Sequence, residues 1–198
     1  MGYYIRVLGL DTRSFTTEDL DEIKGIIMKN EGIDFDYQIN GQNEDGSLKG
    51  FIIKNMKGED IADVSIDRKQ GNLLDEEIEE FKEDIKEYVS QKNYEWLGNY
   101  LDKVEIIYAF QVLNKGFEPK NWDIIYALHN TIWNGVGGIW QADESQFSNE
   151  DGSVIMADWE ASKWTDAKNT QVALLNDDNT WDTFEIKSEK DFLRFIAG

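Results

Sequence analysis

Carboxylates are the most abundant side chains in this sequence that could do chemistry. The chain of 198 residues has 40 acidic side chains against 20 basic ones, a formal net charge of −20. Two carboxylates about 5–10 Å apart in a cleft form the catalytic pair of many glycoside hydrolases. Among forty acidic residues, however, no spacing singles out one pair. A carboxylate-based hydrolase is one hypothesis, and an Asp or Glu with a raised pKa in a pocket would favour it.

His129 is the only histidine, and the chain contains no cysteine. An imidazole titrates near neutral pH, so His129 could serve as a general base. It falls on the apolar face of a predicted helix, between Tyr126 and Trp133, and no serine or aspartate spacing supplies a catalytic partner. We therefore expect a packing histidine. The lack of cysteine excludes disulfides, thiolate nucleophiles and zinc–cysteine sites.

The pentapeptide Asn-Glu-Asp-Gly-Ser occurs twice, at 43–47 and 149–153. Its acidic residues and glycine suggest a calcium loop, in which glycine is sixth and acidic ligands stand at the first, third, fifth and twelfth positions. Alignment on Gly152 puts Phe147 first, and alignment on Gly46 puts Gly41 first. Essential ligands are thus missing, whereas Asp-Gly between strand-like segments is a strong hairpin signal. We predict two hairpin turns, with no metal and no cofactor.

Exposed acidic and aromatic side chains remain as candidates for binding. An acidic run at 75–87 accompanies an apolar stripe at Ile78, Phe81 and Ile85. Its charged face is either a solvated helix surface or an anionic stripe for a basic partner. Six of the seven tryptophans follow residue 104; tryptophan is enriched in interface hot spots, although core packing is the alternative. The residues predicted to bind are Glu76, Glu80, Glu83, Glu87, Trp140, Glu150, Asp151 and Trp164.

The elements that position these residues are predicted to form two copies of one unit. The two pentapeptides are 106 residues apart, and a similar offset relates the strand-like segments 3–8 and 106–113. Each unit is expected to run β-α-β-β-β-α, an α+β fold with antiparallel sheets and helices packed on one face. We predict domains at 1–91 and 105–198, joined by a helix at 92–104. The second copy has an extra strand and an insertion near 161–169.

Local signals mark the ends of three predicted helices. Thr16 and Asp19 form a capping-box pattern, and Ser188 with Asp191 suggests a capped final helix. Pro119, the only proline, suits the first position of a helix, where no backbone donor is needed. The pair Gly137-Gly138 then predicts the end of that helix.

One part of the sequence resembles a group of uncharacterised bacterial proteins, which also tend to begin with a strand like Tyr-Ile-Arg-Val-Leu. The similarity covers 3–10 and, more densely, about 107–152. It rests on Ile107–Gln111, Trp122, Asn130, Ile132-Trp133, Gly137–Ile139, Gln141–Asp143 and Phe147–Gly152. The resemblance implies no activity and no catalytic residues. In charge and in the lack of a catalytic signature, the chain also resembles toxin-neutralising immunity proteins.

These observations favour a non-catalytic acidic protein that covers a basic protein partner, such as a nuclease toxin, as an inhibitor or immunity protein. The alternatives are a structural or self-associating protein and, third, the hydrolase. A charge of −20 repels nucleic acid and anionic membranes. No apolar run approaches the roughly 20 residues of a membrane span, and no signal peptide is recognised. We expect a cytoplasmic protein that is not an enzyme, and a homo-oligomer stays open.

Overall fold

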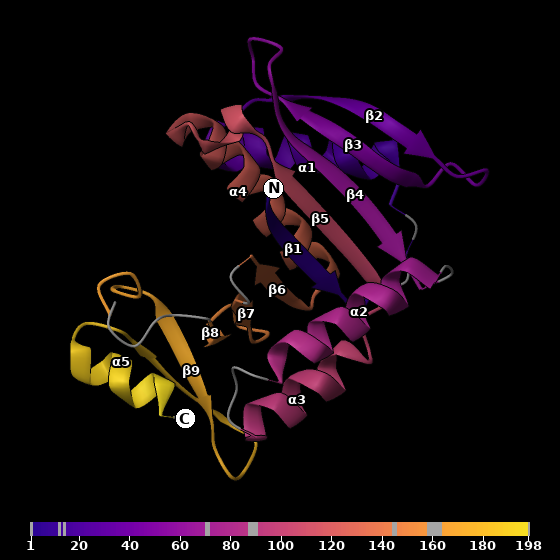
Figure 1. Ribbon diagram of the computed structural model, residues 1–198. Helices are drawn as coiled ribbons and strands as arrows, with labels where there is room; N and C mark the ends of the chain where they lie inside the picture. Colours follow the sequence, from indigo (N-terminus) through magenta and orange to yellow (C-terminus); the bar gives the residue numbers. More distant parts are fainter. Residues whose placement is uncertain are drawn as a thin grey trace. The chain divides into compact units, whose positions relative to one another are not determined.

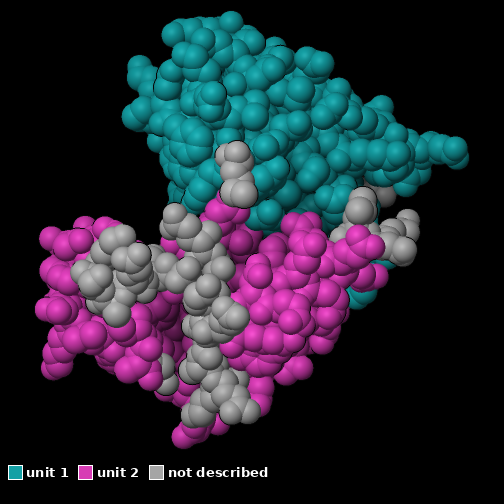
Figure 2. Space-filling model, viewed as in Figure 1, with its two compact units in different colours: residues 1–74, 104–138 teal, residues 75–103, 139–198 magenta. Residues whose placement is uncertain are grey.

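The computed structural model describes residues 2–11, 13, 15–69, 72–86, 91–143, 146–157 and 164–197. Within them the protein is an α+β protein whose strands pair mostly antiparallel (Figure 1). The chain forms two compact units, and each is built from two separate segments (Figure 2). Unit 1 comprises Met1–Leu74 and Val104–Gly138, and unit 2 comprises Asp75–Lys103 and Ile139–Gly198.

Unit 1 contains five strands in the order β1-β5-β4-β3-β2, all antiparallel. Its elements are β1 (Tyr3–Gly9), α1 (Thr17–Glu31), β2 (Asp36–Gln42), β3 (Leu48–Lys54), β4 (Asp60–Arg68), β5 (Ile106–Val112), the 3-10 helix η1 (Asn114–Phe117) and α4 (Pro119–Val136). Figure 1 shows α1 and α4 on the same face of this sheet.

The core of unit 1 lies between that sheet face and the two helices. Phe110 pairs with Val64 in the register, and Tyr108 pairs with Val7, so these four side chains point to one face. All four are at most 1% exposed. Burying one such apolar side chain contributes about 1.5–3 kcal/mol. The Phe110 ring also contacts the imidazole of His129 on α4, which places α4 on this face.

Unit 2 contains shorter strands, in the order β10-β9-β8-β7-β6. Its elements are α2 (Asn72–Ile85, in this unit from Asp75), α3 (Gln91–Leu101), β6 (Ile139–Ala142), β7 (Gln146–Ser148), β8 (Val154–Met156), β9 (Gln171–Leu175), β10 (Trp181–Glu185) and α5 (Glu189–Ile196). The pair β8–β9 is parallel, and the other pairs are antiparallel.

Helices cover both faces of β10 in unit 2. Trp181 and Phe184 are three residues apart in this strand, so their side chains point to opposite faces. Trp181 contacts Trp96 of α3 edge to face, at 4.9 Å between ring centroids. On the other face the guanidinium of Arg194, from α5, lies 4.2 Å from the Phe184 ring centroid. Phe192 and Phe195 of α5 are buried in a core cluster on that side.

The predicted local signals are confirmed at helix ends. The Thr16 side chain accepts a hydrogen bond from the Asp19 amide, and the Asp19 carboxylate accepts one from the Thr16 amide. The Ser188 side chain caps α5, and Pro119 opens α4. Gly137, with φ at 64°, follows the last residue of α4, and β6 begins two residues later.

The tandem repeat is not confirmed, and the compact units do not follow the predicted boundaries. The segment predicted to open a second domain, β5, lies between β1 and β4 in the sheet of unit 1. The predicted connecting helix, α3, belongs to unit 2. All residues of β5 except Gln111 are buried. Side chains on both faces of this strand are apolar enough for burial, which suits a central position in the sheet. Residues 161–163 of the predicted insertion lie outside the described residues.

The two copies of the pentapeptide are instead two of four hairpin turns with the same backbone pattern. In turns 43–47, 55–59, 149–153 and 176–180, the first amide donates to the fifth carbonyl, and the fourth amide donates to the first carbonyl. Each turn begins with asparagine, and the fourth residue has positive φ: glycine in three turns and Asn179 in the last. Glycine takes this conformation at little cost, and asparagine tolerates it. The shared sequence therefore reflects a shared turn geometry.

Candidate functional site

All described residues that were predicted to bind belong to unit 2. Glu76, Glu80 and Glu83 lie on α2, and Trp140 lies in β6. The others are in the 149–153 turn and at Trp164. Glu87 lies outside the described residues. These predicted residues thus belong to one compact unit, but the contacts found among the described residues do not join them into a single cluster.

The acidic face of α2 is exposed. Ile78, Phe81 and Ile85 are buried on one side of the helix, as the periodicity predicts. Glu76 and Glu80, one turn apart, are exposed and form no hydrogen bond or ion pair within the described residues. Unpaired like charges at this spacing destabilise a helix by roughly 0.2–0.5 kcal/mol per pair. A cationic partner would remove that repulsion.

Part of the charge on α2 is already neutralised within unit 2. Lys82 Nζ lies 2.7 Å from the Asp102 carboxylate and 2.8 Å from that of Glu79. The hydrogen bonds to Asp102 and Glu79 raise the pKa of Lys82 above its usual value. Glu83 forms an ion pair with Lys86. The stripe predicted from the sequence therefore has two free carboxylates, at Glu76 and Glu80, and a third that is paired.

The 149–153 turn presents two further carboxylates, those of Glu150 and Asp151, which are exposed. Asn149 is fully buried beneath them, and its side-chain oxygen accepts hydrogen bonds from the amides of Asp151 (3.1 Å) and Ser153 (2.9 Å). The hairpin prediction is confirmed for both copies of the pentapeptide. In the described part of the chain no group of three or more potential ligands is placed to hold a metal ion.

The predicted tryptophans are half-buried. Trp140 and Trp164 both pack against the core cluster of unit 2, which includes Val172, Ile186 and Phe192. Each indole thus has part of its surface committed to the core, and the remainder is available to solvent. For both residues the sequence left two interpretations open, binding to a partner and packing in the core. The structure shows that part of each side chain packs in the core.

The partition of charge between the units was not visible from the sequence. Divided at 1–104 and 105–198, the chain has 24 acidic and 13 basic residues in one half (−11) and 16 and 7 in the other (−9). Unit 2 has 23 acidic and 9 basic residues (−14), whereas unit 1 has 17 and 11 (−6). Unit 2 is also the shorter of the two. Most of the excess charge is therefore concentrated in one compact body.

A cavity in unit 2 was also missed from the sequence. It has a volume of about 420 Å³ and lies between α3 and the turn that joins β9 to β10. Trp96 and Tyr100 of α3 line it, stacked at 5.1 Å between ring centroids. The Tyr100 hydroxyl is buried and has no hydrogen-bond partner among the described residues. Burial, and then the charge of Glu150, raise its pKa. The sequence predicted only that α3 is a connecting helix. No local pattern shows that the turn between β9 and β10 lies opposite this helix.

Unit 1 has an exposed aromatic surface. The rings of Tyr3, Phe117 and Trp122 lie 6.1–6.2 Å from one another, and the Phe117 side chain is 54% exposed. Tyr126, one turn beyond Trp122 on α4, is 57% exposed. Trp122 itself is half-buried. We call these four residues the aromatic surface of unit 1.

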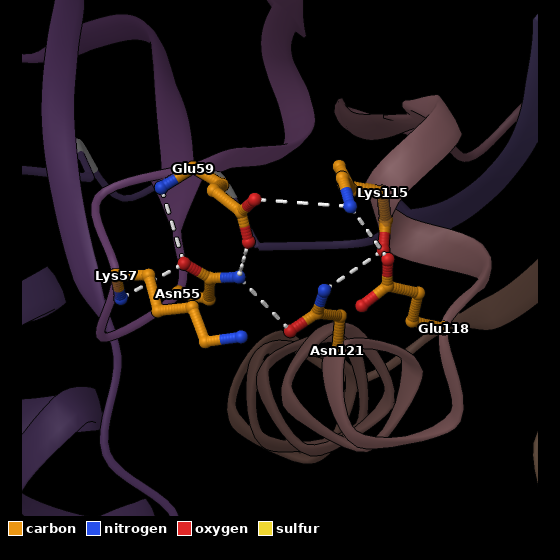
Figure 3. A network of polar contacts seen from close by, with 6 residues as sticks. All are labelled: Asn55, Lys57, Glu59, Lys115, Glu118 and Asn121. Atoms are coloured by element: carbon orange, nitrogen blue, oxygen red, sulfur yellow. Dashed lines mark hydrogen bonds and ion pairs between the residues drawn. The ribbon is translucent and has the colours of Figure 1, made fainter.

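A polar network joins the segments of unit 1 that include Phe117 and Trp122 (Figure 3). The side-chain oxygen of Asn55 accepts from the amides of Lys57 and Glu59, and its nitrogen donates to the Glu59 carboxylate at 2.8 Å and to Asn121 Oδ1 at 3.3 Å. Asn121 donates to the Lys115 carbonyl at 2.8 Å. The network therefore joins the β3–β4 turn to η1 and to the start of α4, next to Phe117 and Trp122.

His129 is 5% exposed, and burial lowers its pKa. Its ring nitrogens lie 3.4 Å from the Arg6 carbonyl and 3.5 Å from Asn130 Oδ1. These are packing contacts, as predicted. The resolved carboxyl shifts are all toward lower pKa, at Asp11, Asp45, Glu59, Asp178 and Asp191. At Glu59, for example, the hydrogen bond from Asn55 is the largest cause. None of these shifts supplies the raised pKa that the hydrolase hypothesis requires.

Comparison with models of protein families finds no match for this chain. Comparisons with curated proteins and with solved structures find no match either. Across the residues described, no helix is both long enough and apolar enough to cross a lipid bilayer.

Proposed function

We propose that this chain is a non-catalytic acidic binding protein of the cytoplasm, and that unit 2 covers a basic surface on a protein partner. The concentration of charge supports the proposal: −14 of the net −20 belongs to unit 2. Complementary charge steers association and selects partners, whereas it adds less to the intrinsic affinity. A partner of this protein is therefore expected to be selected first by its own positive potential.

An inhibitor or immunity-type protein for a basic toxin fits this surface best. A nuclease must attract phosphate, so the rim of its active site is cationic. On unit 2 the free carboxylates of Glu76 and Glu80 would meet such a rim, with Glu150 and Asp151 as further contacts. The half-buried indoles of Trp140 and Trp164 offer apolar area of the kind that interface hot spots use.

The test begins with tagged wild-type protein, used to recover a partner from lysate of its own host. The affinity of the recovered partner is then measured for two double variants. Glu76→Gln with Glu80→Gln removes two free carboxylates from unit 2. The control, Glu31→Gln with Glu44→Gln, removes two exposed carboxylates from unit 1.

We expect a basic partner whose dissociation constant rises steeply with salt. The unit 2 variant should weaken binding about tenfold, and the control should weaken it less than about threefold, because non-contacting charges act only through the screened long-range field. Equal weakening by both variants would contradict the assignment to unit 2. Recovery of no basic protein would contradict the proposed function itself.

The aromatic surface of unit 1 favours one second candidate, a self-associating protein. Exposed aromatic side chains in mutual contact are typical of interface hot spots. If that surface mediates self-association, sedimentation equilibrium should show a dimer for the wild type and a monomer for Phe117→Ser. A wild type that stays monomeric at all accessible concentrations rejects this candidate.

A further inference from the structure

Unit 1 also contains a cavity, in addition to the one in unit 2. None of the sequence motifs indicated it. It has a volume of about 210 Å³ and lies between α1, α4 and the segment that joins β1 to α1. That volume is several times the roughly 30 Å³ that one molecule of liquid water occupies. Its lining residues are Asp11, Arg13, Phe15, Asp19, Glu22, Ile23, Ile26, Tyr108, Thr131, Ile132, Gly135 and Val136. The cavity is thus large enough for a small organic molecule.

The lining combines aliphatic walls with negative charge. Ile23 and Ile26 come from α1, and Ile132 and Val136 come from α4. Three carboxylates line the same cavity, against a single guanidinium, that of Arg13. Because opposite charges attract over short distances, this lining favours a cation and disfavours an anion. The aliphatic walls favour a ligand that also has a hydrocarbon part.

A tyrosine hydroxyl also belongs to the lining of the cavity. Tyr108, on the central strand β5, is 1% exposed, and its hydroxyl forms no hydrogen bond within the described residues. Tyr108 lines the cavity together with Asp11, Asp19 and Arg13, and the charges of these three groups act on its hydroxyl. Among the charges that act on this hydroxyl, that of Arg68, which lies outside the lining, has the largest effect.

The wall of the cavity already accommodates one cation. The guanidinium of Arg13 forms an ion pair with Asp11 and donates a hydrogen bond to the Gly135 carbonyl at 3.5 Å. The Arg13 side chain is nevertheless 73% exposed, so it leaves the interior of the cavity unfilled. Glu22, by contrast, is exposed and has no ion pair or hydrogen bond within the described residues. One acceptor at the rim and one hydroxyl at the floor are therefore free.

We propose that this cavity binds a primary ammonium group on a short aliphatic chain. The ammonium would lie near Glu22 and Asp19, with the Tyr108 oxygen as an acceptor, and the chain would pack against Ile23, Ile132 and Val136. An ammonium has three donors, which match these separate acceptors. A neutral hydrocarbon would leave the Tyr108 hydroxyl unpaired, and a carboxylate would face three like charges.

This inference goes beyond the proposed function, because the cavity belongs to unit 1 and the proposed partner surface belongs to unit 2. The same chemistry has two sources: a free alkylamine or the side chain of a lysine in a peptide. Two probes separate them, n-pentylamine and N-acetyl-lysine methylamide. Their uncharged counterparts, 1-pentanol and the ε-acetylated lysine derivative, control for the hydrocarbon part.

Binding is measured by isothermal titration calorimetry and by amide chemical-shift changes in nuclear magnetic resonance. We expect saturable binding of at least one ammonium probe and none of its neutral counterpart, with shifts at Thr131 and Ile132. Tyr108→Phe, which removes only the hydroxyl, and Glu22→Gln should each weaken binding on the order of tenfold, the usual loss for one charge-assisted hydrogen bond. Glu31→Gln, on the same helix but outside the cavity, should leave the affinity within about twofold.

The outcomes separate the possible occupants. Saturation by pentylamine alone assigns the cavity to a free amine, and saturation by the lysine probe assigns it to a peptide side chain. Failure of both ammonium probes to saturate, equal binding of a neutral counterpart, or unchanged affinity in Glu22→Gln would overturn the proposal. Because Glu22 is exposed, that variant keeps the test valid even if Tyr108→Phe unfolds. None of these results depends on whether unit 2 binds a basic protein.

Discussion

Units 1 and 2 differ in both construction and charge. The strands of unit 1 are seven to nine residues long and form one antiparallel sheet, whereas those of unit 2 are three to five residues long and include a parallel pair. Unit 1 has a net charge of −6 and unit 2 one of −14. Like charges destabilise a compact body. The longer, regular strands and most of the negative charge therefore belong to different parts of one chain.

Gly138→Ala should produce the largest change in stability, and it should act on unit 1. Gly138 has φ at 112°, and a Cβ there would lie 2.0 Å from the Leu8 carbonyl oxygen, which belongs to the backbone of β1. Strained backbone and overpacking each cost about 1–3 kcal/mol, so we expect a loss of about 3 kcal/mol or more. Urea unfolding measures this loss. Hydrogen exchange of β5 and β9 amides shows whether unit 1 opens without unit 2.

Gly25→Ala is the matched control in unit 1. No atom lies within 4 Å of the new Cβ, and the residue is inside α1, so alanine should stabilise the protein by about 0.5–1 kcal/mol. If Gly138→Ala were as stable as the wild type, the close approach of residue 138 to β1 would not constrain the fold.

Asparagine substitutions in the two identical pentapeptides should have intermediate and unequal effects. Asn149→Ala in unit 2 removes the oxygen of a fully buried side chain, which accepts two backbone hydrogen bonds, so we expect a loss of about 1–3 kcal/mol. The Asn149 side-chain nitrogen is buried without a partner, which favours the lower end of that range. Asn43→Ala in unit 1 removes one hydrogen bond from an exposed residue and should cost less than about 0.5 kcal/mol.

Thermal and urea unfolding of both variants measure this contrast. Equal losses would mean that the turn backbone, which the two copies share, decides the cost. Unequal losses would mean that burial in the surrounding unit decides it, although the five residues are the same.

Acid should destabilise unit 1 through His129. We expect this effect on stability to be smaller than those of Gly138→Ala and Asn149→Ala. Burial holds the pKa of His129 below its unfolded value, so the unfolded chain takes up the proton first. Stability is therefore complete above the unfolded pKa of about 6.5 and is lost as the pH falls from there toward the folded pKa, by at most about 1.4 kcal/mol per pH unit. His129→Gln should have a shallower loss between pH 7.5 and 5.5 in urea unfolding. An identical pH slope in both proteins would contradict a neutral, buried histidine.

Local structure could be predicted from the sequence because its causes are local. The Thr16 capping box, Pro119 at the start of α4 and the Asp-Gly turns each depend on a few neighbouring residues, and all are confirmed. The repeat inferred from the pentapeptides is not confirmed. Four turns share one geometry and begin with asparagine, so a likeness between two turns is no evidence of a repeated unit. The continuous apolar run from Ile106 to Phe110 was a signal for a central strand, but it does not say which strands flank it.

The candidate sites were harder to predict from the sequence, because they depend on which distant segments contact one another. The acidic residues of α2 were identified from their run, but their free and paired members could be separated only once Lys82 and Lys86 had been placed. The cavity of unit 1 combines residues from four separate segments, and Tyr108 had no local signal beyond that of an apolar strand. The charge of unit 2 is a property of two segments that the sequence separates.

Because each unit is made of two segments, the order of synthesis constrains how the chain folds. The ribosome makes β1 to β4 first and then α2 and α3, which belong to the other unit, before it makes β5. Unit 1 therefore lacks its central strand while the first parts of unit 2 emerge. The apolar faces of α2 and α3 stay uncovered until β6 to β10 have been synthesised. A fragment that ends at residue 103 would contain part of each unit and the whole of neither. Long-range closure of this kind is slow and leaves unpaired strand edges exposed during synthesis.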